Sequence, residues 1–161
     1  MKRLVVATTA ALALAGVATI ADAQDKKGVE VGMLRCHEAS GWGLIFGSTH
    51  DLKCTFSGTG KDAKPVGFNG TIKRYGVDIG YKGSAVILWA VATTSDSFTP
   101  GEIAGSYGGL TAEASWAAGL GANVLLGGSK KGIALQPVSV TGIAGANLAA
   151  GVVEVELTQA N

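Results

Sequence analysis

The feature that most constrains this chain is an N-terminal export signal. Two basic residues precede an apolar run over residues 4–20, and residues 21–23 (Ala-Asp-Ala) form the small-x-small pattern after which signal peptidase cuts. The apolar run is shorter than the roughly 20 residues that a membrane-spanning helix needs, which favours cleavage over a retained anchor. We therefore expect a signal peptide over residues 1–23 and a single domain over residues 24–161, which is periplasmic or secreted.

The chain has two cysteines, Cys36 and Cys54, which lie 18 positions apart. An even number of cysteines in an exported protein predicts a disulfide. Closing a loop of this length contributes about 3 kcal/mol, mainly by restricting the unfolded chain. A redox role would favour a C-x-x-C spacing, so we interpret the pair as a structural link.

Length and composition indicate one folded domain. Removing 23 of 161 residues leaves 138, which suits a single core. The 13 basic and 12 acidic residues become 11 of each, so net charge gives no reason to expect binding to nucleic acid or to an anionic membrane surface. Glycine is abundant, with 25 residues, but only 16% of residues are charged, so a glycine-rich folded chain is expected rather than disorder.

Alternation of apolar and polar residues between glycine-containing turns predicts a mainly antiparallel β fold. Strand periodicity and turn chemistry are the same in a small barrel and in a sandwich, so both stay open. The most apolar segment, residues 84–93, is expected to be a central strand covered on both faces. The expected strands are residues 29–36, 41–47, 52–56, 66–72, 76–81, 84–93, 107–116, 122–126, 132–140 and 148–157.

The remaining segments are expected to be turns and loops. Residues 48–51 and 58–64 are predicted polar turns, and residues 93–100 a loop that ends in a Pro-Gly turn. Residues 121–127 and 145–151 share a Gly-Ala-Asn pattern, which indicates two similar hairpins or chance in a chain rich in glycine and alanine. Residues 112–118 favour one helical turn as an alternative to strand.

Residues that could carry catalysis or hold a metal do not form a convincing pattern. Ser48, His50 and Asp51 have the types of an acyl-transfer triad, but near-adjacent residues seldom align in that way. His37, Glu38 and His50 are the one candidate metal cluster, and no H-E-x-x-H pattern accompanies them. The glycine-rich segments lack the spacing of nucleotide-binding loops. We therefore predict no enzyme activity, no catalytic residue, no metal and no cofactor.

Aromatic residues are the candidates for binding. Trp42, Tyr75, Tyr81 and Tyr107 are predicted to contact a ligand or partner, whereas Trp89 belongs to the core. Trp42 lies between two glycines near the cysteine pair, where an exposed indole could contact a small ligand, a lipid headgroup or a protein.

Seven short segments together carry a resemblance to a known family. They are Leu34-x-Cys36, Phe46-Gly47-Ser48, Asp51-Leu52-x-Cys54-Thr55-Phe56, Gly76-Val77-Asp78-Ile79-Gly80, Leu88-Trp89-Ala90-Val91, residues 121–128 (GANVLLGG) and residues 133–138 (IALQPV). With these segments the chain resembles a bacterial envelope family, the domain of unknown function 992. The resemblance spans nearly all of the chain after the signal peptide, and it implies export and one fold. It implies no activity, ligand or catalytic residue. The C-terminal third is also similar to the lipid-binding SYLF domains.

Two hypotheses follow for function. The first is a non-enzymatic exported protein that binds a lipid or another apolar ligand. The alternative is a structural or assembly subunit of the envelope, which associates with an envelope protein or with copies of itself through exposed strand edges. An outer-membrane barrel is a third reading, but aromatic residues make up only 6% of the chain, too few for two aromatic girdles.

Overall fold

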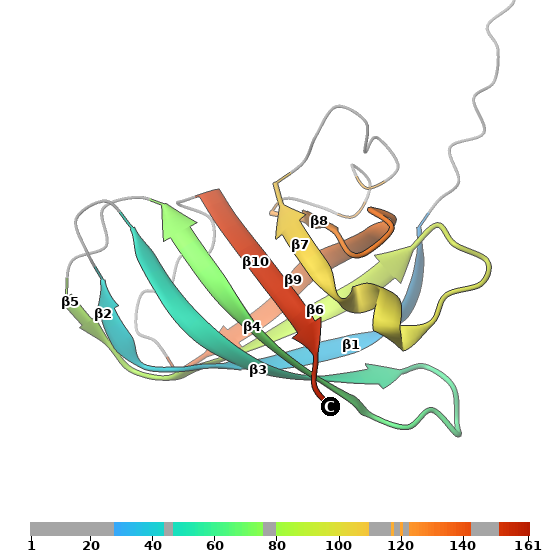
Figure 1. The fold of residues 1–161 in the computed structure, drawn as a ribbon, viewed down its shortest axis with the longest axis horizontal. Helices are drawn as coiled ribbons and strands as arrows, with labels where there is room; N and C mark the ends of the chain where they lie inside the picture. Colours follow the sequence, from blue (N-terminus) through green and yellow to red (C-terminus); the bar gives the residue numbers. More distant parts are fainter. Residues whose placement is uncertain are drawn as a thin grey trace, which may run out of the picture.

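The strands form a closed antiparallel barrel, which decides between barrel and sandwich (Figure 1). The computed structural model describes residues 28–43, 47–75, 80–109, 117, 120, 123–142 and 152–161. The order around the barrel is β1-β3-β4-β10-β7-β8-β9-β6, and β2 and β5 form a separate two-stranded sheet. The elements are β1 (Val29–Glu38), β2 (Gly41–Gly43), β3 (Ser48–Gly58), β4 (Val66–Tyr75), β5 (Gly80–Lys82), β6 (Ala85–Thr93), the 3-10 helix η1 (Pro100–Ile103), β7 (Gly105–Gly108), β8 (Leu125–Gly127), β9 (Ile133–Thr141) and β10 (Val152–Gln159).

Alternation along the strands divides each one into an inner and an outer face. On β3, His50, Leu52 and Cys54 are buried inside, whereas Asp51 and Lys53 are exposed outside. The inner face of the barrel is filled by side chains, as expected for a barrel of eight strands, and it is apolar except for polar residues at the rims. The buried core consists of Leu34, Cys36, Leu52, Cys54, Phe56, Phe68, Ile72, Ile87, Trp89, Val91, Ile103, Tyr107, Leu125, Ile133, Leu135, Val153, Val155 and Leu157.

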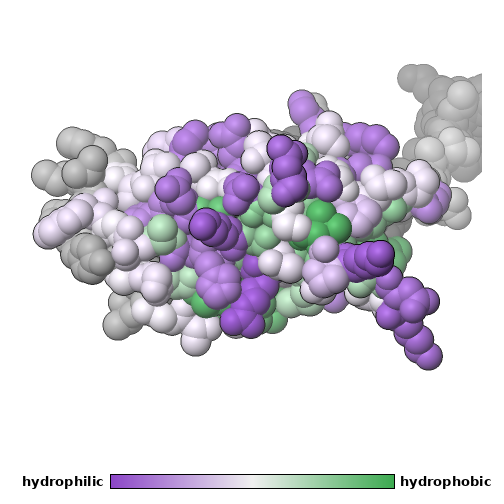
Figure 2. Space-filling model, turned by 60° about the horizontal axis from the view of Figure 1, so that its bottom comes forward, coloured by the Kyte–Doolittle hydropathy of each residue, from purple (hydrophilic) through white to green (hydrophobic). Residues whose placement is uncertain are grey.

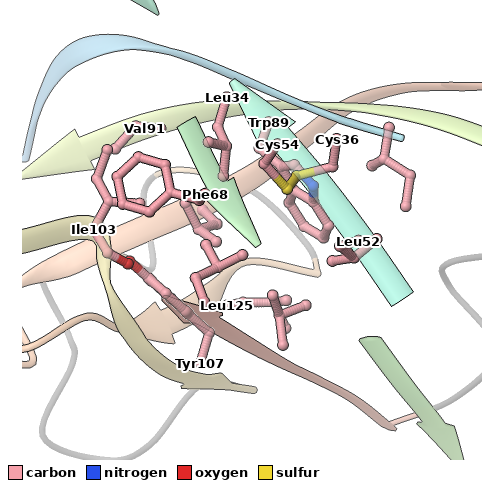
Figure 3. Close-up of a cluster of buried hydrophobic side chains, with 14 of the residues drawn as sticks. Leu34, Cys36, Leu52, Cys54, Phe68, Trp89, Val91, Ile103, Tyr107 and Leu125 are labelled. Carbon is pink, nitrogen blue, oxygen red and sulfur yellow. A yellow bond between two sulfur atoms is a disulfide. The ribbon is translucent and has the colours of Figure 1, made fainter. Parts of the chain in front are cut away.

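The predicted disulfide between Cys36 and Cys54 is present. The two residues lie directly opposite each other on β1 and β3, so the bond joins neighbouring strands inside the core. In Figure 3 the disulfide lies among the buried side chains, with Trp89 projecting toward it from β6. The link therefore reinforces a pair of strands that the barrel already brings into register.

Strand β6 is covered on both faces only near its end. Trp89 and Val91 are buried inside the barrel, but Leu88 and Ala90 on the outer face are only half-buried. Ala92 is buried outside the wall, in a second cluster with Ala117, Val124 and Ala134. The expectation that residues 84–93 are covered on both faces along their whole length was wrong, because the second cluster packs only against the end of the strand, at Ala92.

One predicted turn was wrong and two were confirmed. Residues 48–51 begin β3 instead of forming a hairpin turn, because the polar side chains of Ser48 and His50 have a buried place at the barrel rim. Residues 59–65 connect β3 to β4, with the Ala63 amide donating to the Gly60 carbonyl at 3.1 Å. The loop after β6 ends at Pro100, which starts η1.

Some expectations concern parts of the chain outside the described residues. These are the signal peptide over residues 1–23, most of the helical turn expected over residues 112–118, and the second Gly-Ala-Asn segment over residues 145–151. None of the helical segments in the described part of the chain combines the length and apolarity needed to span a bilayer. On the face shown in Figure 2, hydrophilic side chains predominate and hydrophobic ones show in small areas between them.

Candidate functional site

A hollow of about 480 Å³ opens at the end of the barrel where β1 ends and β3 begins. We call it the rim hollow. Its lining residues come from β2 and from two neighbouring barrel strands, β3 and β4. The short sheet of β2 and β5 extends from this end of the barrel (Figure 1). It is lined by Trp42, Gly47, Ser48, Thr49, Lys73, Arg74 and Tyr75.

Trp42 is the most exposed aromatic residue of the described chain, with 72% of its surface accessible. It lies in β2 opposite Tyr81 of β5, so the short sheet holds the indole over the rim hollow. The predicted contact role requires an exposed indole, and the indole is exposed; the contact itself stays a prediction. The side chain of Tyr81 lies outside what the structure describes.

Tyr75 forms another part of the wall and is half-exposed. Its hydroxyl donates to Oε2 of Glu154 at 3.3 Å. The Nζ atom of Lys73 lies 3.7 Å from Oε1 of the same carboxylate. Glu154 therefore holds both side chains from the neighbouring strand β10, and all three groups remain partly open to solvent.

Beneath the hollow, Arg74 forms an ion pair with Glu38. The guanidinium donates from Nη1 to Oε1 and from Nη2 to Oε2, the second bond measuring 2.6 Å. The Glu38 side chain is 1% exposed and that of Arg74 14%. A bidentate arginine–carboxylate pair is strong and fixes the plane of the guanidinium, so this pair ties the ends of β1 and β4 together beneath the hollow.

His50 completes the buried polar group at this end. Its Nδ1 lies 3.2 Å from the carbonyl oxygen of Ala39 and 3.9 Å from Oε1 of Glu38. The carbonyl contact requires a proton on Nδ1, because a carbonyl only accepts. Gly41 passes directly over the ring, and a Cβ there would lie 2.9 Å from it. Nε2 is buried and has no hydrogen-bond partner among the described residues.

Tyr107, which the sequence placed among the contact residues, is a core residue. It is 1% exposed, and its hydroxyl donates to the carbonyl oxygen of Ile103 at 2.6 Å. Burial raises the pKa of the phenol. Figure 3 shows the ring pointing into the barrel toward the other core side chains. The correction follows from strand phase, because Tyr107 falls on the inner face of β7.

The structure separates the residues considered for catalysis and for metal binding. Ser48 and His50 lie on the inner face of β3, whereas Asp51 lies on the outer face, so these three do not converge. His37 is exposed on the outer face of β1, away from the buried Glu38 and His50. Within the described residues, no three His, Cys, Asp or Glu side chains are grouped to hold a metal ion.

Sequence reasoning missed Lys73 and Arg74, and considered Glu38 only as a metal ligand. One signal was present: Glu38 and Arg74 each occupy an inner position in an otherwise apolar alternation, and buried charges are almost always paired. The pairing partner itself could not be read, because the two residues are 36 positions apart.

A second hollow, of about 400 Å³, lies at the opposite end of the barrel, between the start of β1 and η1. Its walls combine apolar residues, such as Val31, Phe56 and Phe98, with polar ones, which include Lys64, Ser95 and Asp96. The rings of Phe56 and Phe98 meet edge to face with centroids 5.8 Å apart. This end of the barrel is thus closed by aromatic packing.

Comparison with known proteins decides the family. The model of the family described as "Protein of unknown function (DUF992)" matches residues 15–158. The chain belongs to this family. No curated protein and no solved structure matches it. The resemblance inferred from the sequence segments is confirmed, and the similarity of the C-terminal third to SYLF domains stays a prediction.

Proposed function

We propose that this member of the DUF992 family is an exported, non-enzymatic binding protein that holds an amphiphilic component of the cell envelope, such as a lipid, in the rim hollow. The observation that carries the proposal is the exposed indole of Trp42, positioned by a separate small sheet over a hollow next to a second exposed aromatic residue, Tyr75. Aromatic side chains with one apolar and one polar end suit ligands of mixed polarity.

The packed interior supports a site outside the barrel wall. Ligand-carrying barrels keep an internal cavity. Here the centre is occupied by large side chains from all around the barrel, including Trp89, Phe68 and Tyr107. An apolar ligand inside the barrel would have to displace these side chains, whereas the rim hollow accepts a ligand without disturbing the core.

The buried polar group supports a non-catalytic role. Glu38 and Arg74 neutralise each other beneath the hollow, and the carboxylate of Asp51 faces away from Ser48 and His50. An activated nucleophile needs an adjacent base that a third group orients, and Asp51, the orienting group of the triad considered from the sequence, lies on the opposite face of β3 from His50. We therefore propose that the buried polar residues Glu38, Arg74 and His50 shape the hollow.

Native mass spectrometry of the mature protein, purified under mild conditions from its own host, tests the proposal. We expect an added mass of several hundred daltons on the wild-type chain. Trp42→Ala should lose most of the adduct, because it removes the indole that lines the hollow. Val29→Ala is the matched control, since Val29 is 65% exposed at the opposite end of the barrel. A wild-type chain that is always bare, or an adduct indifferent to Trp42, contradicts the proposal.

The alternative, an assembly subunit that associates through strand edges, stays a prediction. The eight barrel strands pair around a closed circle, which hides their edges. Among the described residues, the strands outside that circle are β2 and β5. Sedimentation velocity across a hundredfold range of concentration tests this alternative, which requires a reversible oligomer.

A further inference from the structure

The two exposed aromatic side chains of the described chain lie together at one end of the barrel. Trp42 is 72% exposed and Tyr75 50%, and both line the rim hollow. Among the residues that the structure describes, large exposed rings are therefore confined to the end that carries the proposed ligand site. The other aromatic side chains of this part of the chain are buried or half-buried: Phe56, Phe68, Trp89, Phe98 and Tyr107.

This end is also an extremity of the molecule. In Figure 1 the short sheet of β2 and β5 lies at one end of the longest axis, and the start of β1 lies toward the other end. Tyr75 is the last residue of β4 and lies at the same end as the short sheet. A flat surface that approaches the molecule end-on therefore meets the sheet that carries Trp42 before it meets the middle of the barrel wall.

The aromatic surface at this end is too small for a stable protein interface. An aromatic side chain buries at most about 250 Å², so Trp42 and Tyr75 together supply at most about 500 Å². A stable protein complex buries about 800 Å² on each partner. Partial insertion into a lipid bilayer needs far less, because a tenfold gain in affinity corresponds to about 60 Å² of apolar surface removed from water. The remaining lining residues are glycine or polar: Gly47, Ser48, Thr49, Lys73 and Arg74.

The polarity of the two rings fits the boundary between lipid and water. The hydroxyl of Tyr75 donates to Oε2 of Glu154 at 3.3 Å, so the polar end of the side chain has a partner while the side chain is half-exposed. Tryptophan and tyrosine are enriched where a bilayer meets water, because their rings are apolar and their N–H or O–H groups are polar. Both rings therefore suit the layer of lipid headgroups.

Charge gives this end no preference for an anionic surface. The Nζ atom of Lys73 lies 3.7 Å from the carboxylate of Glu154. Arg74 is paired with Glu38 in the same way, so carboxylates of this chain balance both cations of the lining. The expected mature chain also has equal numbers of acidic and basic residues. A contact made here is expected to depend on apolar burial and not on the charge of the lipid.

We infer that this end of the protein docks on the surface of a lipid bilayer, with Trp42 and Tyr75 in the headgroup layer and the rim hollow open toward the lipid. The amphiphilic ligand then enters the hollow from the membrane. The inference rests on the proposed function and extends it by naming the surface from which the ligand is taken. Insertion of two rings is shallow, so the contact is reversible.

Flotation with phosphatidylcholine vesicles tests the inference. We expect the mature wild-type chain to move with the vesicles in a density gradient. The apparent affinity should change by less than about twofold when a fifth of the lipid is replaced by anionic phosphatidylglycerol, or when the salt concentration is raised to about 0.5 M. Electrostatic adhesion would instead increase with the anionic lipid and decrease with salt.

Two variants and a control locate the contact. Trp42→Ala should weaken vesicle binding about tenfold and Tyr75→Ala about threefold, in the order of their exposure. Val29→Ala is the matched control and should leave binding unchanged, because Val29 is 65% exposed at the opposite end of the barrel. The thermal unfolding midpoint of each variant checks that the chain is folded.

Tryptophan fluorescence gives a second readout that leaves the contact residues unchanged. In a Trp116→Phe background, the remaining tryptophans are Trp42 and the buried Trp89. Vesicles of lipids brominated near the headgroup end of the acyl chains should quench the Trp42 emission and leave the Trp89 emission unchanged. Flotation without quenching would place the contact on another surface and overturn the inference.

The outcomes separate the inference from the proposed function. A chain that carries a Trp42-dependent adduct in native mass spectrometry but does not bind vesicles overturns the inference and leaves the proposed function standing. Vesicle binding that requires anionic lipid, or that is equal in wild type and Trp42→Ala, also overturns it. Trp42-dependent vesicle binding by a chain that is always bare supports the docking surface and contradicts the proposed ligand.

Self-association is a further outcome. A concentration-dependent oligomer that Trp42→Ala abolishes would assign this end to a second copy of the chain and overturn the inference. A monomer that neither binds vesicles nor carries an adduct contradicts both the inference and the proposed function.

Discussion

The two ends of the barrel are closed in different ways. At the end where β1 begins, Phe56 and Phe98 pack edge to face beside a hollow that is lined by both apolar and polar residues. At the other end, the ion pair of Glu38 and Arg74 lies buried beneath an open hollow. Apolar closure stabilises a fold without directing any group outward, whereas a buried ion pair gives little net stability but fixes the orientation of a charged group. The comparison points to the polar end as the place where function resides.

The two ends also differ in their ion pairs. Glu102 of η1 pairs with Lys130 at 2.7 Å, but the lysine side chain is 68% exposed. In the pair at the other end both side chains are mostly or fully buried. Solvent screens an exposed pair and weakens it, so the same chemistry should have a small effect in one place and a large one in the other.

Replacement of aromatic residues should show the largest contrast between the ends. Phe56→Ala should lower the free energy of unfolding by about 3–5 kcal/mol, because it opens a cavity in a core where Phe56 is 1% exposed. Trp42→Ala should change it by less than about 0.5 kcal/mol, since most of the indole is in solvent. Guanidinium denaturation with the disulfide intact measures both values. Equal losses would mean that Trp42 is a packing residue and would remove the basis of the contrast.

Breaking the buried ion pair should have the next largest effect. Glu38→Ala should cost about 3 kcal/mol, toward the lower end for buried pairs because the Arg74 side chain is 14% exposed. The double variant Glu38→Gln with Arg74→Gln should cost distinctly less, since two amides replace two charges with little change in volume. Denaturation curves of the two variants check this order. A double variant less stable than Glu38→Ala would show that the charges themselves stabilise the barrel.

The exposed ion pair should have the smallest effect, and one limited to acid pH. The hydrogen bond from Lys130 lowers the pKa of Glu102 from 4.5. A carboxylate whose pKa is lowered by folding adds stability above its unfolded pKa, and this contribution is lost as the pH falls through the folded value. Lys130→Gln should therefore slightly reduce stability at neutral pH and make the decline below about pH 4.5 shallower. Thermal denaturation from pH 3 to 7 measures the difference, and parallel wild-type and variant curves would contradict it.

Much of the fold could be predicted because the information is local. The alternation of inner and outer residues on β3 or β4 is a property of consecutive side chains. The expectation of export and an even cysteine count predicted the link between Cys36 and Cys54 without reference to strand order. Local patterns failed at residues 48–51, where polar side chains looked like a turn although their phase continues the strand.

The candidate site was only partly predictable. The exposure of Trp42 followed from its glycine neighbours, but the same reasoning included Tyr107, which lies on the inner face of its strand. Composition makes a tyrosine a candidate for contact, and only its phase relative to the barrel axis decides which way it points. Lys73 and Arg74 were not predicted, because nothing in the local sequence shows that the end of β4 borders a hollow.

By itself, then, the sequence determined a β fold with two-faced strands, a disulfide link, membership of a family and an exposed indole. The tertiary structure alone decided that the strands close into a barrel, that β1 pairs with both β3 and β6, and that Glu38 meets Arg74. The physical reason is that the alternation of apolar and polar residues is a property of neighbouring residues, whereas strand order and register are set by the joint packing of side chains that are distant in the chain.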